Sequence, residues 1–283
     1  MKYFLLIPIF CFGTIQAQTK QGTSAKNVVK KIDSKEESRF YVKGYLDYGL
    51  ASPNAFNGVP IVAANTILKP SKTGWGQGLK VGIGGAYIYN DFVNFGLDID
   101  YFLSPKIESS AASSVVQINS VFNGQILAFT PNVTFKAIQS PDFYPYCRVG
   151  VTIGVPFSMT NTTGIVTTVG STKTAAQSIY SFKASPAFGY IAALGVRKSL
   201  SSGLKLFVEL QANNLTIQPQ SASLTTYTVN GEDKLATRSL AEREITYKDD
   251  ANTTVNPNSP TQTETTSFLV ARICLQIGFT FRF

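Results

Sequence analysis

The last residues of the chain alternate between apolar and polar side chains. Apolar residues take every second position from Ile273 to Phe283, and residues such as Gln276 and Arg282 stand between them. A period of two is that of a β-strand whose two faces meet different surroundings. The segment is also long enough for a tilted strand to cross a bilayer. We therefore predict a strand here, with an apolar face that ends in the terminal aromatic residue.

Seven further segments show the same alternation, and with the last they predict eight antiparallel strands. These segments are 40–50, 79–89, 93–101, 121–137, 143–153, 188–197 and 204–211. The segment 121–137 is irregular, because polar Asn123 and Gln125 share the parity of Leu127 and Phe129. We attribute the irregularity to a bulge near Pro131.

The links between these segments alternate in length. Asn90-Asp91, 139–142 and 201–203 are short, whereas 51–78, 104–120, 154–185 and 214–266 are long. Short turns at one end and long loops at the other are typical of membrane β-barrels. The predicted fold is therefore all-β: a transmembrane antiparallel up-and-down β-barrel of eight strands, with short periplasmic turns and long extracellular loops. An even number of strands places both termini on the short-turn side.

The N-terminal residues resemble an export signal. Lys2 precedes an apolar run that is too short to span a membrane, and Ala17 offers a small residue for cleavage. Residues 1–17 are predicted to be a signal peptide, 18–38 a flexible periplasmic lead-in rich in lysine, and 39–283 the barrel domain. Two cysteines remain after cleavage. We expect Cys147 to face outward and Cys274 inward, so that no disulfide joins them.

Composition narrows the possible chemistry. The chain has no histidine, which excludes Ser-His catalysis and histidine metal sites. We expect no enzyme activity, no catalytic residue, no cofactor and no metal. The net charge of +8 could suggest nucleic acid, but no basic face with interleaved aromatic residues occurs, so we expect no nucleic-acid partner.

Charged residues fall on the faces opposite to the apolar ones, which places them inside the predicted barrel. Buried charges must be paired, and an eight-stranded barrel is just wide enough for its own side chains. Glycines such as Gly82 and Gly84 are expected to leave room for them. An alternative is that Asp98 and Asp100, two residues apart on one face, hold a cation. The predicted interior salt-bridge network consists of Lys43, Asp47, Lys80, Asp98, Asp100, Arg148, Arg197, Lys205, Glu209, Arg272 and Arg282.

With these features the chain resembles the small bacterial outer-membrane β-barrel superfamily, of the OmpA/OmpX-type or PorT-like kind. The closing residues Ile277–Phe283 are similar to the C-terminal assembly signal of such proteins, with Phe279, Phe281 and Phe283 as its aromatic positions. The resemblance implies insertion by the barrel assembly machinery into the outer membrane of a Gram-negative bacterium. It also implies periplasmic termini and contact with outer-membrane lipid and lipopolysaccharide.

Four functional hypotheses follow, because one fold serves many functions. The first is a non-enzymatic structural or surface-interaction barrel whose extracellular loops contact a partner, such as lipopolysaccharide or an envelope protein. The second is a narrow channel or small-solute transporter. The third is an accessory subunit of a secretion or envelope assembly complex. The fourth is a soluble lipocalin-type barrel, which would turn its apolar face inward and its charges outward.

Overall fold

The computed structural model describes residues 38–51, 67–69, 76–103, 106–137, 143–252, 254 and 256–283. These residues are almost entirely β-structure, which confirms the all-β prediction. The predicted signal peptide and the lead-in up to residue 37 lie outside the described residues. Among the described residues, no helix has both the length and the apolar character needed to cross a bilayer.

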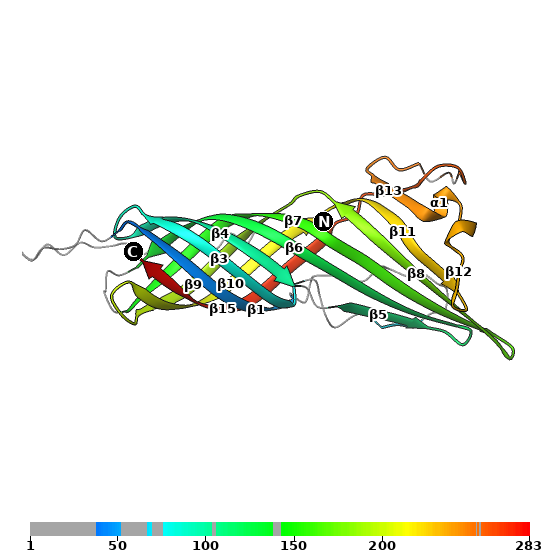
Figure 1. Cartoon of the computed structure of the whole chain (residues 1–283), viewed down its shortest axis with the longest axis horizontal. Helices are drawn as coiled ribbons and strands as arrows, with labels where there is room; N and C mark the ends of the chain where they lie inside the picture. The colour runs from blue at the N-terminus through cyan, green and yellow to red at the C-terminus, as the bar shows by residue number, and fades with distance from the viewer. Residues whose placement is uncertain are drawn as a thin grey trace, which may run out of the picture. The chain divides into compact units, whose positions relative to one another are not determined.

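Eight strands are joined in a closed circuit of antiparallel pairs (Figure 1). Each pairs with two others, in the order β1, β3, β4, β6, β7, β9, β10, β15 and back to β1. Every predicted strand segment lies largely within one of them. The strands are β1 (Phe40–Ala51), β3 (Gly78–Ile88), β4 (Val93–Leu103), β6 (Val116–Lys136), β7 (Phe143–Val169), β9 (Ala187–Ser199), β10 (Leu204–Ile217) and β15 (Phe268–Arg282).

The described residues form fifteen strands, which are seven more than the eight predicted for the barrel. The further strands lie in the predicted long loops, where Thr, Ser and Val are frequent. They are β2 (Ile67–Lys69), β5 (Ile107–Ala112), β8 (Thr172–Ala184), β11 (Pro219–Val229), β12 (Glu232–Asp233), β13 (Glu244–Lys248) and β14 (Thr261–Glu264), with a 3-10 turn η1 (Leu235–Thr237) and a helix α1 (Leu240–Arg243).

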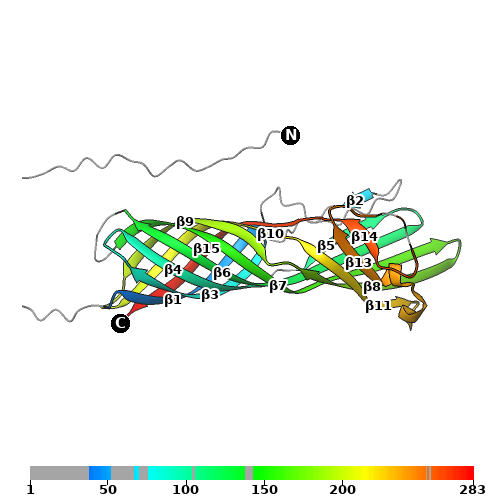
Figure 2. The ribbon, with the colours of Figure 1, turned by 90° about the horizontal axis from the view of Figure 1, so that it is seen from above.

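These additional strands extend the wall of the circuit at one end (Figure 2). β7 pairs with β9 up to Gly154 and with β8 from Met159 onward, in one register. On one side β8 pairs with β11, β11 with β13, and β13 with β14; on the other β6 pairs with β5, and β5 with β2. We call β2, β5, β8, β11–β14 and the parts of β6 and β7 that pair with β5 and β8 the projecting sheet.

The predicted bulge near Pro131 is not where the irregularity lies. Pro131 pairs in register with Leu97 of β4, and the register between β6 and β7 shifts instead at Gln125/Ile126. Even-numbered residues of β6 face inward along the whole strand, including apolar Phe122 and Ile126. The same residues of β6 face inward along its whole length, but the interior that they face changes from polar to apolar. This change alters the pattern of apolar and polar residues in the sequence.

Burial in the circuit is the reverse of that in a water-soluble protein. Outward-facing Leu46, Ile83 and Leu194 have 45%, 64% and 66% of their surface exposed. Inward-facing Lys43, Arg148 and Glu209 are almost completely buried. Charged side chains are rarely buried unless they are paired, and large apolar surfaces are rarely left exposed to water. This arrangement contradicts the lipocalin-type alternative, in which apolar residues would fill the interior.

Candidate functional site: the charged interior

Four predicted residues form one chain of ion pairs through the interior. Lys43 Nζ of β1 lies 2.8 Å from Asp98 Oδ1 of β4. Arg148 of β7 lies 2.6 Å from Asp98 Oδ2, and it also pairs with Glu209 of β10. No two of these four strands are neighbours in the circuit. Each contact therefore crosses the interior past the strand that lies between the two partners. We call Lys43, Asp98, Arg148 and Glu209 the crossing chain.

Four other predicted residues form a second chain along adjoining strands. Lys80 Nζ of β3 lies 2.9 Å from Asp47 Oδ2 of β1 and 3.5 Å from Asp100 Oδ1 of β4. Arg272 of β15 pairs with the other oxygen of Asp47. We call Arg272, Asp47, Lys80 and Asp100 the wall chain. Each of the two chains holds two positive and two negative residues, so charge is balanced within each.

A tyrosine stands between the two chains. Tyr45 donates its hydroxyl hydrogen to Asp100 Oδ1 at 2.6 Å, and its ring lies 5.3 Å from Lys43 Nζ and 5.8 Å from Lys80 Nζ. Tyr146 likewise donates to Glu209 Oε1 at 2.7 Å. These two tyrosines were not among the residues predicted for the network. The sequence pattern could have indicated them, because Tyr45 and Tyr146 are two residues from Lys43 and Arg148 and therefore share the inward face.

The other three predicted residues do not join the two chains. Arg197 is buried, donates to Tyr144 Oη at 3.2 Å and lies against the rings of Tyr41 and Tyr146 at 4.9 and 5.1 Å. Lys205 lies over the Tyr144 ring at 5.4 Å, and Arg282 Nε donates to the backbone carbonyl of Ser38 at 2.7 Å. These contacts provide cation–π and hydrogen-bond stabilisation.

Inward-facing glycines leave space for the charged chains, as predicted for Gly82 and Gly84. A Cβ atom on Gly84 would lie 2.4 Å from Asp98 Oδ1, and one on Gly82 would lie 2.5 Å from Asp100 Oδ1. A Cβ on Gly195 would lie 2.6 Å from the Tyr146 ring. A side chain at any of these positions would displace a member of the interior.

Above the charged chains the interior becomes apolar. The buried residues there come from six strands of the circuit and from β5, so they fill the interior from several sides. Arg272 joins the two regions, because its guanidinium lies 4.7 Å from the Phe102 ring. We call the following residues the apolar cluster: Phe102, Ile107, Phe122, Ile126, Met159, Ala187, Leu215, Ile217 and Val270.

The charged residues of the crossing chain and the wall chain contact one another. Asp98 and Asp100, the predicted alternative cation ligands, each contact at least one cationic side chain. In the part of the chain that the structure describes, no group of three or more acidic or cysteine residues is arranged to hold a metal. Cys274 is buried and Cys147 half-buried, and no disulfide joins them.

The predicted assembly-signal residues lie on the outer surface. Phe279, Phe281 and Phe283 are 51%, 47% and 69% exposed at the end of β15. The rings of Phe281 and Phe283 meet edge to face at 5.2 Å. Other aromatic residues at the same end of the circuit are also exposed, namely Phe40, Tyr89, Phe92, Phe135 and Phe143.

Comparison with known proteins gives matches among solved structures alone: no family model and no curated protein matches the chain. The outer membrane protein OprG of Pseudomonas aeruginosa is 10% identical, with a TM-score of 0.46 over 87% of this chain and 97% of that one. Neisserial surface protein A is 12% identical, with a TM-score of 0.42 over 87% and 98%. The outer membrane protein AlkL in lipid bilayers is 12% identical, with a TM-score of 0.27 over 94% and 97%.

Proposed function

We propose that the protein is a non-enzymatic outer-membrane β-barrel that holds the projecting sheet at the cell surface for contact with a partner. The observation that carries this proposal is the reversed burial of the circuit together with the extension of its strands beyond one end. The circuit is the membrane-crossing barrel of eight strands, and the short turns and both termini face the periplasm.

The outward face of the circuit supports a membrane location. Its apolar residues form a continuous surface that would be costly in water and favourable in hydrocarbon. Exposed aromatic residues at the short-turn end match the interfacial girdle of such barrels. The short turn after β3 is closed by Asn90, whose side-chain oxygen accepts hydrogen bonds from the backbone N–H groups of Phe92 and Val93 at 2.8 and 2.7 Å.

Strand length supports the surface role. β7 has 27 residues and spans about 90 Å at the rise of a β-strand. About 9–11 tilted residues suffice to cross a bilayer. The remaining length, with β8, β11 and β13 paired beside it, extends beyond the membrane on the side opposite the termini. A sheet of this kind offers a large surface to lipopolysaccharide or to a protein of the envelope.

The filled interior favours this function over a narrow channel. A channel would need a continuous path of water, whereas the two charged chains and the apolar cluster occupy the interior at successive levels. The polar character of the interior is the one observation in favour of the channel. Reconstitution into planar bilayers distinguishes the two functions, because a stable unit conductance supports the channel.

Cysteine labelling tests the proposed topology. Lys173→Cys places a thiol near the tip of the projecting sheet, and Asp91→Cys places one in a short turn; both native residues are exposed. In intact cells a membrane-impermeant maleimide should label position 173 and not position 91. Position 91 should react once the outer membrane is permeabilised. The native chain gives the background, since Cys147 faces outward along the wall and Cys274 is buried. Equal labelling of both positions in intact cells would rule out this topology.

A further inference from the structure

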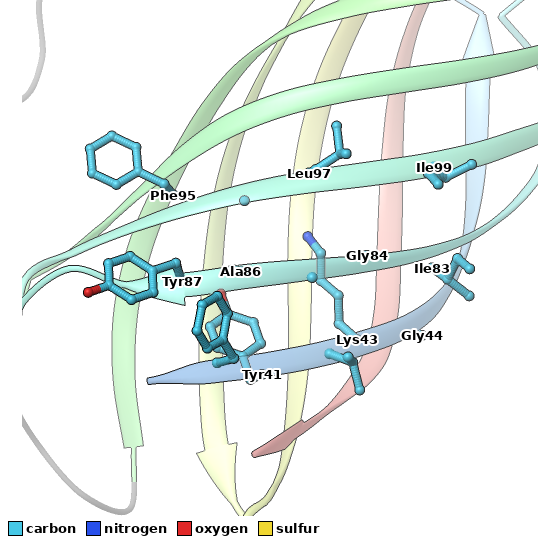
Figure 3. A pocket seen from close by; sticks show the side chains of 14 residues that line it. Tyr41, Lys43, Gly44, Ile83, Gly84, Ala86, Tyr87, Phe95, Leu97 and Ile99 are labelled. Atoms are coloured by element: carbon cyan, nitrogen blue, oxygen red, sulfur yellow. The ribbon is translucent and has the colours of Figure 1, made fainter. Parts of the chain in front are cut away.

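An apolar groove lies on the outer face of β1, β3 and β4, near the short-turn end (Figure 3). Its volume is about 970 Å³, and it opens away from the charged interior. The outward side chains that border it are exposed or half-exposed and entirely apolar apart from one tyrosine hydroxyl. They are Phe40, Val42, Ile83, Tyr87, Phe95, Leu97 and Ile99.

Two outward-facing glycines create the groove. Gly44 of β1 and Gly85 of β3 are diagonal neighbours, because Gly44 pairs with Ile83 and Gly85 with Val42. A Cβ atom at Gly44 would have no atom within 4 Å, and one at Gly85 would come no closer than 3.8 Å to the Tyr41 carbonyl. Neither glycine is among those with a positive φ.

The backbone therefore does not require glycine at either position, in contrast to the inward glycines beside the charged chains. Glycine in a strand interior weakens the strand and often marks a place where a ligand comes close. Outward positions elsewhere, such as those of β15, carry large apolar side chains, for example Leu275 and Ile277. Because the two glycines have no side chains, they leave a hollow in a surface that is otherwise covered by large apolar side chains.

One end of the groove carries a positive charge. Arg39 Nη1 donates to the Tyr87 hydroxyl at 3.4 Å, and the Phe40 and Tyr87 rings meet at 5.1 Å. Among the described residues, the short-turn end is basic, with Asp91 as its acidic residue. The basic residues there are Arg39, Lys136, Lys198, Lys205 and Arg282. An anionic group at the mouth of the groove would meet a guanidinium and a hydroxyl, which together suit phosphate.

We propose that this groove is a binding site for a glycerophospholipid of the periplasmic leaflet. One acyl chain lies over Gly44 and Gly85, and the phosphate meets Arg39 and Tyr87. From Ile83 to Tyr87 the groove runs for about 13 Å along the strand, which suits the part of an acyl chain nearest its headgroup. An acyl chain in the hollow makes van der Waals contacts along that length, and these contacts would be missing if the hollow were empty. The site rests on the proposed membrane location of the circuit.

Filling the groove tests the proposal. Gly44→Leu/Gly85→Leu adds side chains where the structure has room for them, so the barrel should still fold. The native protein and the variant are purified from membranes in mild detergent, supplied with phosphatidylglycerol and examined by native mass spectrometry. The native protein should retain one phospholipid, and the variant should lose it. Ala212→Leu, at an exposed position of β10 on another part of the wall, should retain it.

The phosphate contact is tested separately. Arg39→Gln should weaken retention of phosphatidylglycerol while leaving retention of diacylglycerol with the same acyl chains unchanged. Equal retention of phosphatidylglycerol by the native protein and the filled variant would overturn the proposal. A lipid-free native dimer that the filled variant converts to a monomer would also overturn it, and would identify the groove as an interface between two copies.

Folding and topology have their own readouts. Heat-modifiable gel mobility reports folding of each variant, and Gly44→Ala/Gly85→Ala provides a smaller filling if the leucine variant fails to fold. Labelling at positions 91 and 173 is repeated in the filled variant. If position 173 is labelled and position 91 is protected in intact cells, but the filled variant retains lipid as the native protein does, the lipid site is disproved and the proposed function stands. If the native protein does not show this labelling pattern, both proposals are disproved.

Discussion

Arg148 is the residue on which the crossing chain depends. Its guanidinium contacts Asp98 on one side and Glu209 on the other, and it is almost fully buried. Removing it leaves two buried carboxylates, of which Glu209 keeps the Tyr146 hydroxyl and Asp98 keeps Lys43. Loss of one partner of a buried pair is costly because the remaining charge has already lost its hydration.

We therefore expect Arg148→Met to lower the free energy of unfolding by about 3–5 kcal/mol. The measurement is urea unfolding in lipid vesicles, followed by tryptophan fluorescence or gel mobility. Lys173→Met, at an exposed position of β8, serves as the control and should change little. Adding Glu209→Gln to the Arg148 variant should recover part of the loss. An unchanged unfolding free energy in Arg148→Met would show that the crossing chain does not brace the barrel.

The outer face gives a complementary prediction. Ile277 lies half-exposed in the middle of the outward residues of β15. If this face lies in hydrocarbon, Ile277→Arg should lower the free energy of unfolding by about 2–4 kcal/mol. Gln117→Arg, at an exposed position of β6 in the projecting sheet, should have almost no effect. Similar effects at both positions, measured in the same vesicles, would argue against a membrane-facing surface at β15.

At the scale of elements, the helix α1 shows how one long link is ordered. Ser239 caps it: the Ser239 side-chain oxygen accepts from the Glu242 backbone N–H at 3.3 Å, and the Ser239 backbone N–H donates to Glu242 Oε2 at 2.9 Å. Arg238 pairs with Glu242 at 2.7 Å and lies 3.8 Å from the Tyr227 ring of β11. The capping box orders the first turn of the helix, and the contact between Arg238 and Tyr227 joins this segment to the projecting sheet.

These contacts predict a pH dependence for this link. The Ser239 backbone N–H, followed by the Arg238 guanidinium, lowers the pKa of Glu242 below its ordinary value of 4.5. Because the pKa is lower in the folded link than in the unfolded one, the stabilisation is complete above about pH 4.5 and is lost as the pH falls through the folded value.

Arg238→Gln should accordingly raise the titration midpoint of Glu242, measured from the carboxyl carbon chemical shift. Lys234→Gln is the matched control, since Lys234 pairs with Glu232 at 2.8 Å and not with Glu242. A midpoint that shifts equally in both variants would show a general charge effect and contradict the specific pairing.

The elements of the circuit could be predicted from sequence, and those of the projecting sheet could not. In the circuit the two faces of each strand differ, so apolar and polar residues alternate, as in 273–283. In 160–169 threonine and asparagine fall on both parities, which leaves no period to detect. These residues form strands because β6 and β8 pair beside them. Such pairing depends on long-range register and is absent from any local pattern.

The same distinction holds within the interior. Parity placed Lys43, Asp98 and Arg148 on inward faces. It could not determine that Asp98 would contact both cations, because their strands are not neighbours and their relative heights depend on the stagger of the circuit. The apolar cluster was missed for a related reason. Polar Asn123 and Gln125 were interpreted as a disturbance of the strand pattern. The apolar residues between and beside them, Phe122 and Ile126, mark a change in what the interior contains.

At the scale of the whole molecule, the filled interior predicts electrical silence. The native protein in planar bilayers should give no unit conductance, because the charged chains and the apolar cluster occupy the interior of the circuit. A variant in which a short turn replaces 162–178 should be silent too, since this change removes part of the projecting sheet and no member of the crossing chain or the wall chain. A porin reconstituted in the same bilayers is the positive control. A stable conductance in either form would favour the channel hypothesis.

The continuity of the strands has a mechanical consequence. β8 and β9 keep one register against β7 across the break at 185–186, and β7 itself runs from Phe143 to Val169. No linker separates the two regions. A pull on the tip at 170–171 would therefore load the hydrogen bonds of β7 in shear along the strand, down to the opposite rim. If the circuit lies in the membrane as proposed, a partner that held the tip would transmit force to the circuit directly, because the tip could not rotate independently of it.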